Sequence, residues 1–240
     1  MRKGTIFKYE LKRLLLSKEY LLLLIATLFY SVSLLRSMVL FGTNYTAPFS
    51  QLTFSTYCAS LTPFLSVLLL LLCARQFKAS ERGAEAIISA APMPIKVFRL
   101  LRYAAIGCAY LIAVILSVAI CLCFYLILFK YSSFGTLIWS AVLIFLPSSL
   151  LLFGIAMALG YKHVISVYII LAAVLVIGVF NIKLPSWMDI IGITTAIAPD
   201  DGQVSELSSI FTFSRAAFFM LGLGLTAVSL RTSRVQGNKD

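Results

Sequence analysis

Long apolar runs that are almost free of charge constrain this chain more than any other feature. A helix that crosses a bilayer needs about 20 apolar residues, because lipid offers backbone groups no hydrogen-bond partners. Hydrophobic residues make up 61% of the chain and charged residues 12%, about half the charged fraction of a soluble domain. The sequence therefore predicts an all-α polytopic membrane protein with six transmembrane helices, forming a single transmembrane domain over residues 1–240.

The apolar and polar stretches alternate in a regular order. Residues 1–18 predict an amphipathic helix in the membrane interface, with its cations toward lipid headgroups. A polar cytoplasmic loop is expected over 75–102, an outer re-entrant hairpin over 183–209, and a tail over 231–240. The hairpin is expected because its apolar part, 188–198, is too short to cross a bilayer. The six spans are expected at about 20–41, 51–74, 103–129, 136–160, 164–182 and 210–230.

The basic residues are divided unequally between the two sides of the expected spans. Sixteen Lys and Arg residues flank the spans on the side of the termini and two flank them on the other side. Cytoplasmic loops of membrane proteins carry an excess of Lys and Arg, so both termini and the loop are expected in the cytoplasm. The protein is thus expected in a cell membrane, of bacterial type. The net charge of +11 is spread over these flanks, which argues against a nucleic-acid partner.

The chain lacks the residues that most membrane enzymes need. No Asp or Glu falls within the six expected spans, the single histidine is His163 in a loop, and the five cysteines have no metal-ligand spacing. We therefore expect no catalytic residue, no bound metal and no bound cofactor. The same lack of buried acids argues against a proton-coupled transporter. There is also no GxxxxGK[ST] motif, so any energy from nucleotide hydrolysis must come from a partner.

Two arginines, Arg36 and Arg215, fall within expected spans, both near the outer interface. One interpretation is structural: they reach outer lipid headgroups, or pair with Asp200, Asp201 or Glu206. The other interpretation is functional: they face an outer vestibule and contact a substrate. The sequence leaves both open.

The loop over 75–102 carries the most specific pattern. It predicts a short helix, a glycine break, a second short helix, then Pro92 and Pro94, and then a helix leading back into apolar sequence. Its central part reads Glu81-Arg82-Gly83-Ala84-Glu85, followed by Ala86-Ile87-Ile88-Ser89-Ala90-Ala91-Pro92. Here the chain resembles the membrane subunits of type-2 ABC exporters, whose loop typically reads E-x-G-T-x-E, then apolar residues and a proline. The glycine-to-proline spacing matches. Ala84 replaces the usual threonine, the second acid comes one place early, and Met93-Pro94 replaces a small polar residue.

The resemblance implies a permease subunit whose coupling helix docks on a separate ABC ATPase. It implies two copies of that ATPase, which would bind ATP and magnesium, and a second permease chain, identical or related. The substrate path would be lined by spans one, two and five. The expected docking residues are Glu81, Arg82, Gly83, Ala84, Glu85, Ile87, Ile88 and Pro92.

An interior without acids suits a hydrophobic or amphipathic cargo, such as a peptide, a drug or a lipid. Export of a bacteriocin-type peptide, or immunity to an antimicrobial peptide, is the expected role. The alternative is a scaffold or sensor subunit that recruits a cytoplasmic partner without transporting anything. Pro63, Pro147 and the Gly222-Leu223-Gly224 step favour mobile, closely spaced helices over such a static scaffold.

Overall fold

A computed structural model of the chain describes residues 3–37, 50–77, 94–180, 182, 189–191 and 209–231. Within these residues the chain forms seven α-helices and no β-strand, which confirms the all-α class for this part of the sequence. The helices are α1 (Lys3–Leu15), α2 (Lys18–Leu35), α3 (Gln51–Arg75), α5 (Ile95–Phe129), α6 (Gly135–Gly160), α7 (Val164–Val179) and α8 (Ser209–Arg231).

In the part of the chain that the structure describes, five helical segments are long and apolar enough to cross a bilayer: Lys18–Leu35, Thr53–Arg75, Ile95–Phe129, Gly135–Gly160 and Phe211–Arg231. They overlap five of the six expected spans and support a polytopic protein embedded in a membrane. The other expected span corresponds to α7, which has 16 residues. At ~1.5 Å per residue α7 is about 24 Å long, short of the ~30 Å hydrocarbon thickness. A sixth crossing therefore stays a prediction.

Helix α5 begins earlier than the hydropathy of its sequence indicates. The apolar span was expected from residue 103 and a helix was expected after Pro94; α5 starts at Ile95, which confirms the second expectation, and continues for 35 residues. Its start follows Pro94, because proline disfavours a helical conformation in the residue before it. The first turns are polar and carry Lys96, Arg99 and Arg102. The local hydropathy falls at these charged residues, but the helix continues through them without a break.

Helix α3 lies at the centre of the bundle. It contacts α2, α5, α6 and α7, and its side chains are buried along most of its length. Tyrosine hydroxyls add hydrogen bonds between helices, which hold better in lipid than apolar contacts alone. The Tyr57 hydroxyl of α3 donates to the Ser117 carbonyl of α5 at 2.8 Å, and the Tyr20 hydroxyl of α2 donates to the Ala109 carbonyl of α5 at 2.8 Å.

Helices α6 and α8 approach each other most closely at two glycines. A Cβ atom on Gly222 would lie 2.6 Å from the carbonyl carbon of Leu150, and a Cβ on Gly154 would lie 2.8 Å from the carbonyl oxygen of Gly222. Neither position has room for a side chain. Small residues at a helix contact let the two backbones touch, which is how helices associate tightly in lipid.

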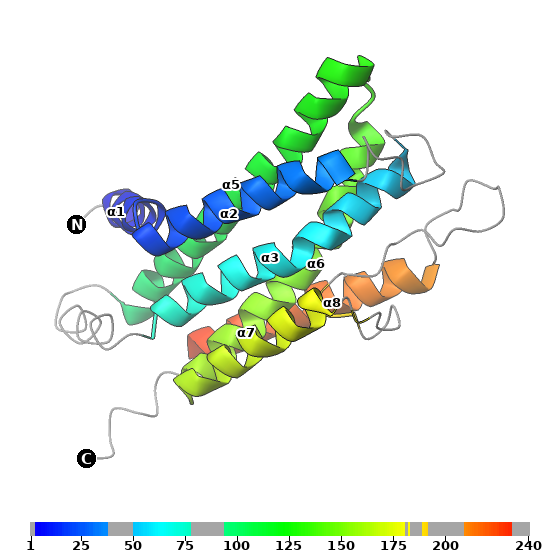
Figure 1. Cartoon of the computed structure of the whole chain (residues 1–240). Helices are drawn as coiled ribbons and strands as arrows, with labels where there is room; N and C mark the ends of the chain where they lie inside the picture. The colour runs from blue at the N-terminus through cyan, green and yellow to red at the C-terminus, as the bar shows by residue number, and fades with distance from the viewer. Residues whose placement is uncertain are drawn as a thin grey trace.

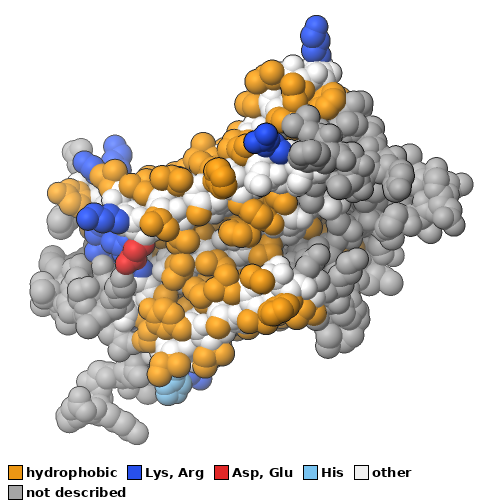
Figure 2. Space-filling view, in the orientation of Figure 1, with side chains coloured by type: hydrophobic (Ala, Val, Ile, Leu, Met, Phe, Trp, Pro, Cys, Tyr) orange, Lys and Arg blue, Asp and Glu red, His pale blue; other side chains and the backbone are white. Residues whose placement is uncertain are grey.

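The two ends of the bundle differ in charge. We call the end with α1, at the left of Figure 1, the basic end. Figure 2 shows Lys and Arg gathered there and a broad hydrophobic surface along the helices. The opposite end holds Arg36 and Lys130. Described basic residues of the basic end are Lys3, Lys8, Lys12, Arg13, Lys18, Arg75, Lys96, Arg99, Arg102, Lys162 and Arg231.

Candidate functional site

The polar loop after α3 leaves the bundle from a firmly packed position. The last described residue before it is Phe77, which is 6% exposed. The Phe77 ring lies against Gly160, where an added Cβ would overlap the ring. The same ring meets Tyr161 edge to face, with centroids 5.3 Å apart. The exit of α3 is therefore packed against the turn between α6 and α7.

The other end of the loop is held by the same turn. Arg99, in the first turns of α5, places its guanidinium carbon 4.8 Å from the centroid of the Tyr161 ring. This geometry is that of a cation–π contact. We call Phe77, Arg99, Gly160 and Tyr161 the loop platform. The residues that flank the loop on both sides thus contact the α6–α7 turn.

Helix α1 is attached to the same region of α5. Arg102 is 4% exposed, and its Nε lies 4.0 Å from Glu10 Oε2 on α1. Glu10 also accepts a hydrogen bond from Arg13 Nη2 at 2.7 Å. Leu14 of α1 is buried against the core, and α1 as a whole packs on α5. The apolar face expected to enter the membrane interface is therefore at least partly covered by protein, while Lys8 stays exposed.

The expected docking residues lie outside the described part of the chain. These are Glu81, Arg82, Gly83, Ala84, Glu85, Ile87, Ile88 and Pro92. Their assignment stays a prediction. The structure describes the loop platform, whose residues flank the loop in sequence and which the sequence analysis did not single out. Two kinds of residue could have indicated it: the aromatic residues Phe77, after α3, and Tyr161, after α6, and an arginine in the first turns of α5.

A groove runs between α2, α3 and α7, with a volume of about 410 Å³. It is largely apolar, and the Tyr30 and Phe64 rings stack in it with centroids 4.1 Å apart. Its Thr27 and Ser60 hydroxyls donate to carbonyls of their own helices at 2.8 and 2.9 Å. Both hydroxyl donors are already used, so the groove offers mainly apolar surface. It is lined by the three helices that correspond to spans one, two and five.

Arg215 lies in a buried polar cluster. It is 1% exposed, and so is Asp189. Arg215 Nη1 donates to Ser148 Oγ at 2.7 Å and to the Asp189 carbonyl at 3.0 Å, and Nη2 donates to Asp189 Oδ2 at 3.2 Å. The guanidinium carbon also lies 4.7 Å from the Phe211 ring centroid. The side chain therefore joins α8 to α6 and to the segment 189–191 inside the protein.

This geometry favours the pairing interpretation of Arg215, with Asp189 as the partner. Asp200, Asp201 and Glu206, the partners weighed from the sequence, lie outside the described residues. The missed signal was that Asp189 stands in an apolar stretch, where a carboxylate needs a cation. Arg36 behaves differently, because it is exposed at the end of α2. Its role stays open.

Few residues with catalytic or metal-binding chemistry come together in the bundle. Within the described ranges, no group of three or more His, Cys, Asp or Glu residues is placed to hold a metal ion. The cysteines of α3 and α5 are free thiols. Comparisons of the chain with protein-family models, with curated proteins and with solved structures found no match.

Proposed function

We propose that the chain is the membrane permease subunit of an ATP-driven exporter of the type-2 ABC class, energised by a separate ATPase. The observation that carries the proposal is the loop platform. Both ends of the polar loop are tied to one turn of the bundle through Phe77 and Arg99. A loop that only connected two spans would not need to be fixed to a third and a fourth helix.

The platform gives the loop a route for mechanical coupling. Gly160 leaves no space between the α6 backbone and the Phe77 ring, so the two move as a unit. Arg102 and Glu10 extend the connection to α1. Closure of a partner ATPase around ATP and magnesium would push the loop, and these contacts would pass the push to several helices at once. No nucleotide need bind to this chain.

The docking element in this proposal is the short helix from Glu81 to Ala91. Its apolar residues, Ala84, Ile87, Ile88 and Ala91, would fill a groove on the ATPase, and its charged residues would form the polar rim. The basic end would face the cytoplasm of a bacterial cell, as the excess of Lys and Arg indicates. Two ATPase copies would then sit beneath two permease chains.

The groove between α2, α3 and α7 supports the second part of the proposal. A second permease chain, identical or related, would face this groove and enclose a path between the two chains. The path walls would be apolar, as the groove is. They suit a hydrophobic or amphipathic substrate such as a peptide, a drug or a lipid. Peptide export or immunity to an antimicrobial peptide is the role we propose.

The docking step is tested by co-purification with the ATPase from the native host. We expect the wild-type chain to recover a protein with a nucleotide-binding motif, and the Gly83→Asp/Ile87→Asp variant to release it. The matched control is Ser132→Asp/Ser133→Asp, which adds the same charges at the exposed link of the opposite end. An ATPase that stays bound to the Gly83→Asp/Ile87→Asp variant refutes the docking assignment.

Transport itself is tested separately from docking. The purified complex in proteoliposomes should hydrolyse ATP faster when an amphipathic cationic peptide is added. A complex that forms but shows no stimulation by peptides, drugs or lipids contradicts the exporter proposal. That outcome favours the alternative, a scaffold or sensor subunit that recruits a partner without passing a substrate.

A further inference from the structure

Helix α1 lies across the start of α2 at the basic end. Figure 1 shows α1 nearly end on, whereas α2 runs along the length of the bundle. Only Leu16 and Ser17 separate the two helices, and α2 is long and apolar enough to cross a bilayer. A helix that crosses a span at its first residue runs near the plane of the membrane. We therefore place α1 at the level of the lipid headgroups.

The two faces of α1 have different surroundings. Its apolar face, with Phe7, Leu11 and Leu14, packs against the core of the bundle, so it is not available to lipid. The opposite face is exposed, and we call it the outward face. It consists of Lys8, Tyr9, Lys12 and Arg13 of α1, together with Leu16, which follows the helix. Contact between α1 and the membrane surface must therefore use the outward face.

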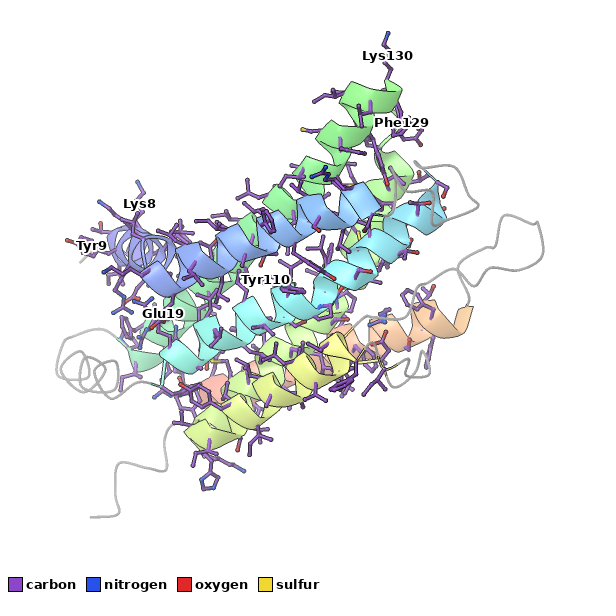
Figure 3. The ribbon with its side chains drawn as sticks, in the orientation of Figure 1. Lys8, Tyr9, Glu19, Tyr110, Phe129 and Lys130 are labelled. Atoms are coloured by element: carbon purple, nitrogen blue, oxygen red, sulfur yellow. The ribbon has the colours of Figure 1, made fainter. Side chains whose placement is uncertain are left out.

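The outward face carries positive charge and no acid. Lys8, Lys12 and Arg13 are all exposed, and Glu10, the only acid of α1, has a side chain that is 15% exposed. In Figure 3 the Lys8 and Tyr9 side chains point away from the bundle. At an anionic membrane surface each Lys or Arg strengthens binding by about fivefold. Charge complementarity thus selects an anionic partner.

Exposed apolar side chains favour lipid over an acidic soluble protein. Tyr9 is 77% exposed and Leu16 is 63% exposed. On α2, soon after Leu16, Leu22 and Ile25 are 69% and 65% exposed. Figure 2 shows this hydrophobic surface reaching the basic end, where the Lys and Arg side chains gather. Tyrosine and leucine beside lysines are the composition of a membrane interface, and the lipid-facing surface of α2 follows directly.

Arg13 of the outward face is also bound inside the protein. Its Nη2 donates to Glu10 Oε2 at 2.7 Å, and the same oxygen lies 4.0 Å from Arg102 Nε on α5. The Arg13 side chain is 39% exposed, whereas that of Arg102 is 4% exposed. A headgroup can therefore reach Arg13 but not Arg102. The two arginines share one carboxylate oxygen, and only one of them has an alternative partner in the membrane.

The magnitudes favour transfer of Arg13 to a headgroup. An ion pair three residues apart on a helix surface contributes about a factor of two to an equilibrium constant. An arginine at an anionic membrane surface contributes about a factor of five. A lipid phosphate would thus take Arg13 from Glu10, and the Glu10 carboxylate would be left to Arg102.

We propose that the outward face of α1 binds anionic phospholipid headgroups and that this binding tightens the attachment of α1 to α5. The lipid phosphates contact Lys8, Lys12 and Arg13, and Glu10 then pairs with Arg102. Arg102 follows Arg99 of the loop platform by three residues, so the lipid strengthens α5 beside the platform. The inference does not depend on export, because it needs only the chain and a membrane.

Hydrogen–deuterium exchange of the full chain in nanodiscs tests the proposal. The nanodiscs contain phosphatidylcholine, with or without phosphatidylglycerol. We expect the amides of α1 to exchange more slowly with phosphatidylglycerol. Lys8→Gln/Lys12→Gln should reduce this gain in protection by as much as about 25-fold, or about fivefold for each lysine. Leu16→Gln should speed exchange in both lipids, because it removes apolar contact rather than charge.

Glu10→Gln separates lipid binding from its effect on α5. This variant keeps the cations of the outward face, so α1 should still respond to phosphatidylglycerol. The first turns of α5 should respond in the wild type and lose their response in Glu10→Gln, because Arg102 no longer has a carboxylate to bind. A response of α5 that persists in Glu10→Gln overturns the proposed transfer of Arg13.

A matched control removes two cations of the basic end that are not on α1. Lys162→Gln/Arg231→Gln changes two exposed residues, and exchange of its α1 amides should respond to phosphatidylglycerol as in the wild type. Equal exchange of wild-type α1 in the two lipids overturns the proposal, as does an equal loss of response in the control. Protection of α1 that appears only when a partner ATPase is added overturns it too, because the outward face would then bind protein.

Discussion

Removal of the Arg215 side chain should destabilise the bundle strongly, because it leaves Asp189 as a buried carboxylate without its cation. Arg215 donates three hydrogen bonds, to Ser148 and Asp189, and all the partners are buried. Breaking one side of a buried ion pair costs about 3–5 kcal/mol. We therefore expect Arg215→Leu to lower the free energy of unfolding by this amount.

The double variant Arg215→Leu/Asp189→Leu identifies the cause. With both charges removed, the site holds apolar groups only, and much of the lost stability should return, because replacing a whole buried pair is often close to neutral. Arg36→Leu is the control, since Arg36 is exposed, and its effect should stay within about 0.5 kcal/mol.

The measurement is unfolding in mixed detergent micelles, followed by tryptophan fluorescence with increasing sodium dodecyl sulfate. The wild type, Arg215→Leu, Asp189→Leu and the double variant form a double-mutant cycle, and Arg36→Leu is its control. If Arg215→Leu unfolds at the same detergent fraction as Arg36→Leu, the buried pair does not hold the bundle together. If the double variant is less stable than Arg215→Leu by the full cost of Asp189→Leu, the two residues are not coupled.

Two glycine positions give further predictions in the same assay. Gly222→Val should lower the free energy of unfolding by at least about 2 kcal/mol, because the new side chain overlaps the α6 backbone. Gly224→Val, where nothing lies within 4 Å, should lower it by about 1 kcal/mol or less. Equal effects of the two substitutions would contradict the close contact of the two backbones. Gly160→Leu should lower the free energy of unfolding by about 1–3 kcal/mol, because it displaces the Phe77 ring. Phe77→Ala in the same chain should restore part of this loss. A Gly160→Leu protein that is as stable as the wild type contradicts the loop platform.

Apolar runs were enough to find most of the helices. Five expected spans have long helices in the structure, because in lipid the backbone must be hydrogen-bonded within each segment and length follows from bilayer thickness. The ends were harder to predict. The first turns of α5 lie before its apolar run, and their residues Arg99 and Arg102 lie near Tyr161 and Glu10, which are far away in sequence. Hydropathy carries no information about such contacts.

The short helix α7 shows a second limit. Its segment reads as one apolar run to residue 182, yet the helix ends at Val179. Gly178 lies against Pro63 of α3, where an added Cβ would come within 2.6 Å of the proline Cβ. Such a close approach depends on the residues of the partner helix, so it leaves no periodic pattern in the sequence of α7 itself.

The candidate site divides in the same way. The docking motif is a local pattern and stays a prediction, whereas the loop platform and the pair Arg215–Asp189 bring together residues from different parts of the chain. The sequence allowed Arg215 to pair with an acid, to reach lipid headgroups or to face a vestibule. It did not show which acid would reach it, because several acids lie between residues 183 and 209.

The length of α5 has a geometric consequence. Its 35 residues form one helix without proline, about 52 Å from end to end at ~1.5 Å per residue. Its first turns are fixed to α1 and to the α6–α7 turn, while its last turns lean away from the bundle. Tyr57 of α3 still holds this rod at Ser117, so only the last ~18 Å, from Ser117 to Phe129, is free to act as a lever. A tilt of about 10° at Ser117 would carry Phe129 sideways by about 3 Å.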